Sequence, residues 1–386
     1  MTDNNVSDYI TYREGTKKLM TIIGLWPYEN PSFFYRLVPY IQILLSLGMG
    51  LAIFGFVLDH FSNIGLVTRG LSVMTSFITI ILKVVCLVMN QKELVELHTN
   101  LDPYFDKLLT NSKLTKIVLK KVKVYKFLSW SLAFCVFTCL VAYIIGPLVY
   151  ITNCYFNKIT ITKYPLVYPS GYPWKITSNG FVYKIHFIFE TLATSALFFV
   201  TCSVDSLFTL YVFQMVAQLR EMCYCITHIE NEDDSQEVVC KCVNQYEKLM
   251  RSKYILEKIY GPTILWIMGT NAIVLCTLLF QVSQMKSISI IRGMLIVTYV
   301  GIKVIQTFMY AWTGSNLTEE SEVYRRAVYA ANWYGNKNIM AHVIITLCQK
   351  PLTLNACSFA HVSVDIFIKV LNTTVSYFFL LQTLDE

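Results

Sequence analysis

Seven long apolar runs constrain the fold of this chain more than any other feature. Each could cross a hydrocarbon layer about 30 Å thick, which takes roughly 20 residues as a helix. Charged residues make up only 15% of the chain and the mean hydropathy is +0.49, outside the usual range of a soluble 386-residue protein. The sequence therefore predicts an all-α membrane protein with seven transmembrane helices, near residues 36–58, 66–89, 124–151, 181–212, 261–281, 288–312 and 357–384.

Lysine and arginine between the runs predict the orientation, because cytosolic loops retain positive charge. The N-terminal segment and the second, fourth and sixth loops are rich in these residues. The first, third and fifth loops hold fewer, and the C-terminal tail holds none. No cleavable signal precedes the first run. We expect a cytosolic N-terminus and an extracellular C-terminus, which disfavours a G-protein-coupled receptor with the opposite orientation.

Amphipathic helical patterns continue beyond the apolar runs on the predicted cytosolic side. One pattern follows the fourth run, a second extends from Val238 to Tyr260 and ends at Gly261-Pro262, and others follow the sixth run. Such extensions are expected to pack together as an anchor platform where subunits associate. The predicted organisation is a cytosolic segment (1–35), four transmembrane helices that bind ligand (36–212), cytosolic extensions (213–260), two further transmembrane helices (261–312), anchor helices (313–350) and a final helix (351–386).

The final helix carries a narrow polar stripe on an otherwise apolar surface. A helix of this kind requires water on one side and lipid or protein on the others. Leu380 lies on the same stripe, and a narrow apolar ring can stop ions by dewetting. A pore-lining helix is the first interpretation; packing against neighbouring helices is the alternative, because these side chains also form hydrogen bonds between helices. The stripe consists of Lys369, Asn372, Thr373, Ser376 and Thr383.

Catalytic and metal-binding patterns are not evident. Two C-x-C pairs, Cys223 with Cys225 and Cys240 with Cys242, lack the commoner C-x-x-C spacing of zinc sites, and the six histidines form no metal-spaced set. The net charge of +7 concentrates in loops predicted to face anionic lipid rather than in a nucleic-acid-binding patch. We expect no enzyme activity, no cofactor and no nucleic-acid partner. A secondary transporter would show inverted repeats and broken helices, and Gly146-Pro147 is the one candidate break.

The sequence resembles the insect odorant receptors, seven-span proteins with an inverted topology. The likeness runs through most of the chain and is sharpest in three places. These are residues 203–208 (Ser-Val-Asp-Ser-Leu-Phe) with Gln214 and Gln218-Leu219, residues 327–333 (Ala-Val-Tyr-Ala-Ala-Asn-Trp), and residues 349–352 followed by 367–381. The related gustatory receptors, the alternative family, usually end with a Thr-Tyr pair, several apolar residues and Gln-Phe. Here Ser376-Tyr377 is followed by Gln382-Thr383, which favours the odorant branch.

This resemblance implies a non-selective cation channel of four subunits in the plasma membrane of a sensory neuron. Volatile organic ligands would open it, and ligand-binding subunits would join a common co-receptor subunit. The co-receptor has a greatly extended fourth loop, whereas this chain joins its fourth and fifth runs compactly, as a ligand-binding subunit does. In that family the final helix lines the pore, and by position Leu380 corresponds to the apolar gate residue, with Thr383 one turn further out.

The outer halves of the other helices are expected to hold the ligand, mainly through shape and dispersion. Tyr143, Gly146 and Tyr150 share a face that matches the pocket of the family, and the glycine leaves a gap for a small apolar molecule. Ordinary helix packing is the alternative for every candidate. Glu190 could tune the pocket toward hydrogen-bond donors or amines, because a carboxylate in a span is costly unless paired or wet. The other candidates are Met74, Phe77, Ile78, Ile81, His186, Thr194, Leu295 and Tyr299.

Overall fold

The computed structural model describes residues 2–109, 112–157, 164–174, 180–228, 232–283, 290–331 and 337–385, and these are almost entirely helical, as predicted. A single two-stranded antiparallel hairpin accompanies the helices in these ranges. The elements are α1 (Thr2–Ile22), α2 (Phe33–Asp59), α3 (Ile64–Met89), α4 (Gln91–Leu109), α5 (Ser112–Val118), α6 (Val122–Phe156), α7 (Phe181–Thr227), α8 (Glu232–Ser283), α9 (Ile290–Ala330), α10 (Lys337–Cys348), β1 (Asn355–Ala356), β2 (Ala360–His361) and α11 (Val364–Asp385).

Six helices within the described ranges are long and apolar enough to cross a membrane: α2, α3, α6, α7, α8 and α9. They correspond to the first six predicted spans. The seventh corresponds to α11, whose 22 residues make a helix about 33 Å long. That length suffices for the hydrocarbon layer, but a seventh span stays a prediction.

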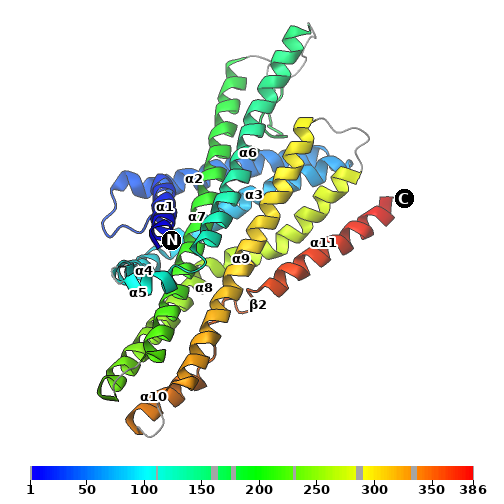
Figure 1. Ribbon diagram of the computed structural model, residues 1–386. Coiled ribbons are helices and arrows are strands. Elements are labelled where there is room, and N and C mark those ends of the chain that lie inside the picture. The colour runs from blue at the N-terminus through cyan, green and yellow to red at the C-terminus, as the bar shows by residue number, and fades with distance from the viewer. Residues whose placement is uncertain are drawn as a thin grey trace.

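Helix α7 forms the centre of the bundle. Nearly every side chain from Val200 to Met222 is buried, on all sides of the helix, because α7 packs against α1, α2, α3, α4, α6, α8 and α9. A helix that is buried on all sides belongs to the core. Figure 1 shows α7 running the length of the molecule, with α6 beside it projecting past the other helices at one end.

The predicted helical extensions are present, because α7, α8 and α9 have 47, 52 and 41 residues and continue well beyond their apolar runs. The ends of these helices gather with α10 at the end of the molecule opposite the α6 and α7 projection (Figure 1), here called the anchor end. Arg220 of α7 pairs there with Glu320 of α9 at 2.5 Å. Residues 332–336, part of the predicted anchor segment, lie outside the described residues.

Two predicted helix boundaries are wrong. Helix α8 continues through Gly261 and Pro262 without ending, and the missing Cβ of Gly261 lets the hairpin approach, since a Cβ would lie 3.1 Å from the Cys357 nitrogen. The final helix begins at Val364 rather than residue 357, because β1 and β2 occupy the preceding residues. Gly146-Pro147, the candidate break, likewise lies inside the continuous helix α6.

The hairpin fixes where α11 begins. A Cβ on Gly314 of α9 would lie 2.2 Å from the Val362 carbonyl oxygen, so only glycine permits this approach. One residue further, Ser315 Oγ accepts a hydrogen bond of 2.9 Å from the Val364 nitrogen. Helix α9 therefore holds the base of α11.

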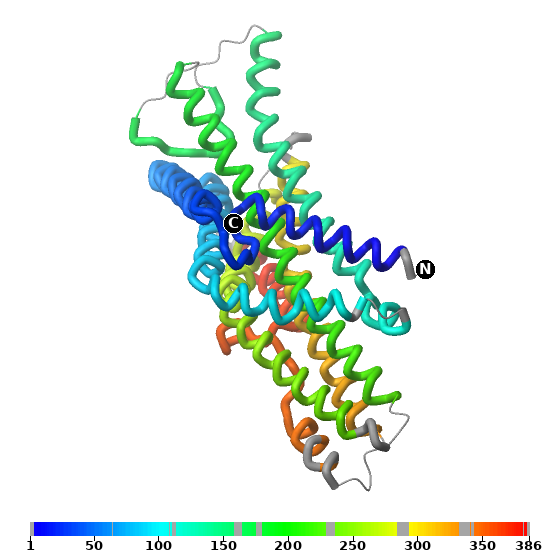
Figure 2. Tube along the Cα trace, turned by 90° about the vertical axis from the view of Figure 1, so that its left-hand side faces the viewer, coloured from blue at the N-terminus to red at the C-terminus, as the bar shows by residue number. Residues whose placement is uncertain are grey.

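The N-terminal helix α1 and helix α4 lie across the long helices rather than along them (Figure 2). The Tyr12 hydroxyl of α1 donates to the Ser206 carbonyl of α7 at 3.0 Å. Arg13 of α1 pairs with Asp102 of α4, whose carboxylate also accepts a hydrogen bond from Gln214 of α7. These contacts tie both crossing helices to the centre of the bundle.

Candidate functional site

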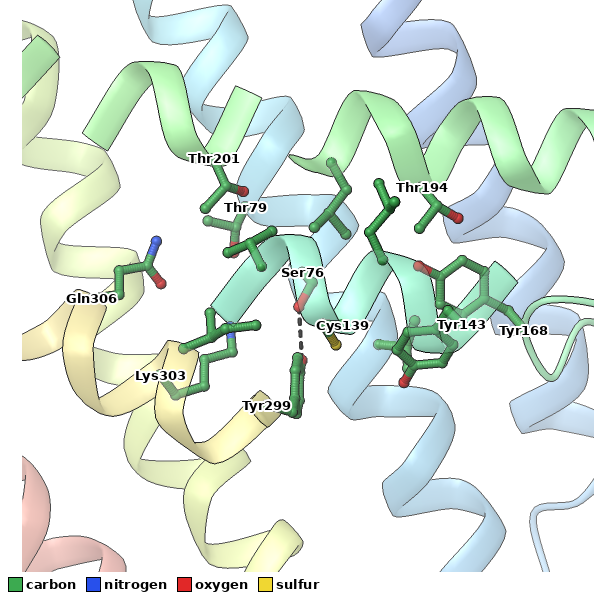
Figure 3. A pocket seen from close by; sticks show the side chains of 15 residues that line it. Ser76, Thr79, Cys139, Tyr143, Tyr168, Thr194, Thr201, Tyr299, Lys303 and Gln306 are labelled. Atoms are coloured by element: carbon green, nitrogen blue, oxygen red, sulfur yellow. Dashed lines mark hydrogen bonds between the residues drawn. The ribbon is translucent and has the colours of Figure 1, made fainter. Parts of the chain in front are cut away.

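A cavity of about 50 Å³ lies inside the bundle between α3, α6, α7 and α9 and is here called the bundle cavity (Figure 3). One water needs roughly 10–15 Å³ on this scale, so there is room for a few groups of that size. The lining is mixed, with aliphatic side chains, three tyrosines and several polar groups. It comprises Val73, Ser76, Thr79, Val136, Cys139, Leu140, Tyr143, Tyr168, Thr194, Leu197, Thr201, Tyr299, Ile302, Lys303 and Gln306.

Three of the predicted ligand-binding residues meet in this cavity: Tyr143 of α6, Thr194 of α7 and Tyr299 of α9. The Tyr299 hydroxyl lies 2.7 Å from Ser76 Oγ and 2.6 Å from the Ser72 carbonyl oxygen (Figure 3). These bonds to α3 hold the Tyr299 ring on the cavity wall. A neighbouring cavity of about 50 Å³ shares Tyr143 and Tyr299 and adds the predicted Leu295.

The predicted face of α3 is rotated away from the bundle cavity. Val73, Ser76 and Thr79 line it, whereas the four predicted residues do not. A shift of one residue turns a helix by about 100°, and apolar periodicity does not distinguish which of two adjacent apolar faces of α3 meets α6 and α9. The four predicted residues are Met74, Phe77, Ile78 and Ile81, of which Phe77 is fully buried.

The predicted face of α6 divides along its length. Tyr143 reaches the bundle cavity, but Tyr150 is 55% exposed, and a Cβ on Gly146 would meet no atom within 4 Å. Tyr150 lies about two turns beyond Tyr143, toward the C-terminal end of α6. This face of α6 is therefore packed against other helices at Tyr143 and largely uncovered at Gly146 and Tyr150.

Residues 164–174, here called the capping loop, supply a wall residue that the sequence did not predict. Tyr168 is buried, with its ring centroid 4.8 Å from that of Tyr143 and 5.5 Å from that of Phe77. Figure 3 shows Tyr143 and Tyr168 together at one end of the cavity, beside Thr194. The capping loop therefore closes that end of the cavity with an aromatic side chain.

Glu190 of α7 anchors the capping loop and does not line the bundle cavity. Its fully buried carboxylate accepts hydrogen bonds from the Tyr168 nitrogen (3.0 Å), Ser170 Oγ (2.7 Å) and the Tyr172 hydroxyl (3.1 Å). Burial, together with the nearby carboxylate, raises the pKa of Tyr172, so this phenol remains a donor. A buried carboxylate needs donors, and the hydroxyl-rich loop just before α7 was the signal for them.

Glycine and histidine contacts complete the attachment of the capping loop. The Gly171 nitrogen donates to the Ala52 carbonyl of α2 at 2.9 Å. A Cβ on Gly171 would clash with the backbone of α2, and a Cβ on Gly55 of α2 would clash with the Gly171 carbonyl oxygen. The predicted His186 accepts a hydrogen bond from Trp174 Nε1 at 3.1 Å. His186 also lines a separate, largely apolar cavity of about 420 Å³ between α2, α7 and the capping loop.

A buried charge cluster lies at the other end of the bundle cavity. Lys83 of α3 and Asp205 of α7 are both fully buried and pair at 2.5 Å. Asp205 also accepts hydrogen bonds from Gln306 Nε2 (2.7 Å) and the Tyr310 hydroxyl (2.6 Å) of α9. Because Gln306 lines the cavity, this cluster connects the cavity wall to three helices.

The polar stripe of α11 faces away from the rest of the chain. Val370 and Thr374 pack inward, and Thr374 Oγ1 lies 3.4 Å from the Ala272 carbonyl oxygen of α8. The stripe lies on the opposite side of α11, which leaves it open to solvent or to another subunit. Its exposed members are Lys369, Asn372, Ser376 and Thr383, Thr373 is partly exposed, and Leu380 is 54% exposed.

Six candidate spans packed around an internal cavity define a multi-pass helical membrane protein. The sequence comparisons place it more narrowly. The family model described as 7tm Odorant receptor matches residues 63–375, so the chain belongs to this family, which is a receptor family and not an enzyme class.

Individual relatives are distant. The odorant receptor coreceptor of Anopheles gambiae is 28% identical over 145 residues, which cover 37% of this chain and 30% of the relative. Odorant receptor 82a of Drosophila melanogaster is 24% identical over 251 residues, which cover 63% of this chain and 64% of the relative. The alignments thus span less than two thirds of the length of these relatives.

Solved structures agree on the fold. The insect olfactory receptor OR5 from Machilis hrabei in complex with eugenol superposes with a TM-score of 0.80 at 18% identity, covering 98% of this chain and 100% of that one. A second structure of OR5 from Machilis hrabei gives a TM-score of 0.78. At this level of identity the agreement establishes the architecture.

Proposed function

We propose that this chain is the odorant-binding subunit of a heterotetrameric, ligand-gated, non-selective cation channel. A small volatile ligand binds in the bundle cavity, and the open pore is lined by α11. The carrying observation is a cavity of mixed polarity inside the bundle, whose walls include α9, the helix that also holds α11. The similarity to odorant receptor 82a of Drosophila melanogaster and to the structure of OR5 in complex with eugenol supports a volatile ligand.

Helix α9 offers a direct route from ligand to pore. Tyr299, Lys303 and Gln306 face the cavity. Two residues beyond Gln306 on the same helix, Phe308 contacts Phe367 of α11, with ring centroids 5.4 Å apart. A rigid helix transmits a small displacement at one contact to the other. A ligand that moves Tyr299 would therefore displace or rotate α11.

The exposed stripe of α11 supports a pore between subunits. Polar side chains in a membrane segment require water or partners, and within the described part of the chain this stripe has little cover. Four subunits around one axis would bring four copies of the stripe together. Leu380 would form the apolar ring that closes the pore, and loss of that ring on α11 movement would admit water.

The partner in this proposal is a co-receptor subunit, with lipid around the assembly. Helix α7 ends at Thr227 and α8 begins at Glu232, so the connection is compact, as the sequence resemblance implies for a ligand-binding subunit. The N-terminus would be cytosolic, the anchor end would associate with other subunits below the membrane, and α11 would end outside. The site of action would be the plasma membrane of a sensory dendrite.

The test is co-expression. The chain is expressed with and without an insect odorant receptor coreceptor, and currents are recorded against a panel of volatiles. The proposal expects cation currents that need both subunits and a ligand. Terminal epitope tags on intact cells report the orientation and surface amount. Silence across the panel with both subunits at the surface, or a C-terminus in the cytosol, contradicts the proposal.

A further inference from the structure

The bundle cavity contains a buried lysine whose charge is not balanced by a partner. Lys303 of α9 is 5% exposed and lines the cavity at the end opposite Tyr168 (Figure 3). Among the residues that the structure describes, no carboxylate lies within ion-pair distance of its ammonium and no hydrogen bond engages it. Its Nζ lies 5.4 Å from the ring centroid of Tyr299, which offers a weak cation–π contact.

The nearest buried carboxylate is already occupied. Asp205 receives Lys83 and the Tyr310 hydroxyl on Oδ1 and the Gln306 amide on Oδ2. Together with Lys303, the buried charge cluster contains two lysines and one carboxylate. Its formal charge is +1 when both lysines are protonated. An unbalanced cation inside a membrane bundle is costly unless water or an acceptor meets it.

The rest of the cavity is suited to an apolar body. Leu140, Leu197 and Val136 are among its lining residues, and Tyr143 and Tyr168 lie together at the end away from Lys303 (Figure 3). Gln306 donates one of its two amide hydrogens to Asp205, which holds its amide against the carboxylate. Lys303 is the charged donor that faces the cavity.

We propose that the bundle cavity selects small organic molecules with a carboxylate or carbonyl oxygen at one end of an apolar body. The oxygen accepts a hydrogen bond from Lys303, and the hydrocarbon part packs against Leu197, Tyr143 and Tyr168. A carboxylate also neutralises the excess charge, whereas a hydrocarbon of the same size leaves the ammonium without an acceptor. This inference rests on the proposed function, because it assigns the ligand class of the same cavity.

The test uses matched ligand series on the co-expressed channel: a linear acid, aldehyde and hydrocarbon with equal numbers of carbons. The wild-type channel is expected to respond to the acid or the aldehyde at concentrations at least about tenfold lower than to the hydrocarbon, equivalent to about 1.4 kcal/mol. This comparison needs no variant. Equal potency across the series overturns the inference.

Two variants locate the preference. Lys303→Met, which keeps an unbranched side chain without the charge, is expected to remove the tenfold preference and to change the hydrocarbon response less than threefold. Lys303→Arg, which keeps a charged donor, should retain the preference. If Lys303 has a purely structural role, the Met variant should change the potency of all three ligands by the same factor. That result overturns the inference.

Ligand binding separates this inference from the channel proposal. The purified complex is heated with each ligand, and stabilisation by the ligand is measured without any current. Stronger stabilisation by acid or aldehyde than by hydrocarbon in a complex that passes no current supports the ligand class and contradicts the channel. Gated currents with no acceptor preference support the channel and overturn the ligand class.

Discussion

Replacing Glu190 with alanine should release the capping loop from the bundle. The carboxylate is fully buried and accepts hydrogen bonds from the Tyr168 nitrogen, Ser170 Oγ and the Tyr172 hydroxyl. Each hydrogen bond to a charged group contributes about 1.5–3 kcal/mol. The released donors form hydrogen bonds with water instead, which offsets part of the loss. We therefore count two of the three hydrogen bonds at the lower value, a loss of about 3 kcal/mol in the free energy of docking the loop.

That loss corresponds to roughly a hundredfold change in the ratio of docked to released loop, at about 1.4 kcal/mol per factor of ten. Val167 lies in the loop and is 5% exposed when docked, so a cysteine there reports release. The assay measures how fast Val167→Cys reacts with a membrane-impermeant thiol reagent, with and without Glu190→Ala. Protein without the added cysteine gives the background from the twelve native cysteines.

The expected result is faster labelling in the alanine variant, by one to two powers of ten. Glu190→Gln, which keeps one acceptor oxygen in a side chain of the same size, should give an intermediate rate. Because Tyr168 forms part of the cavity wall, odorant potency should fall in the same order. Labelling rates within threefold of each other in all three backgrounds would refute the anchoring role of Glu190.

Three further substitutions test the pore and the buried charges. Leu380→Ala should raise the ligand-independent current because it removes the apolar ring, whereas unchanged basal current and selectivity at normal surface amounts would count against a gate at this position. Asp205→Asn leaves Lys83 without its partner, which should destabilise the fold by about 3–5 kcal/mol and lower both thermal stability and surface amount. Adding Lys83→Met should recover part of that stability, and no recovery would argue against a direct interaction of the pair.

Element lengths and helix class could be predicted from the sequence because apolar runs and 3.6-residue periodicity are local signals. The runs identified α2, α3, α6, α7, α8 and α9 as candidate spans, and the amphipathic patterns identified their extensions. The break at Gly261-Pro262 was wrong because local breakers do not reveal tertiary contacts. There, the hairpin packs against the glycine and the helix continues.

The candidate site was predicted less completely, since it depends on which helix faces meet. Tyr143, Thr194 and Tyr299 reach the bundle cavity, whereas the α3 residues chosen lie one position out of phase with its wall. Tyr168 was missed because a loop between spans carries no periodicity that shows where it folds back. Lys303 is visible in the sequence as a charge within the predicted span 288–312, but its place on the cavity wall depends on the packing of α9 against α3 and α6.

The most direct test of the channel account is the water accessibility of α11. Cysteines are introduced at Ser376 and Thr383 on the exposed stripe and at Thr374 on the packed face, and thiol reagents are applied during ligand-evoked current in complexes with the co-receptor. The account predicts that modification changes the current at Ser376 and Thr383 while the channel is open, and leaves it unchanged at Thr374. Modification of current at Thr374 with none at the two stripe positions would contradict a pore lined by this helix.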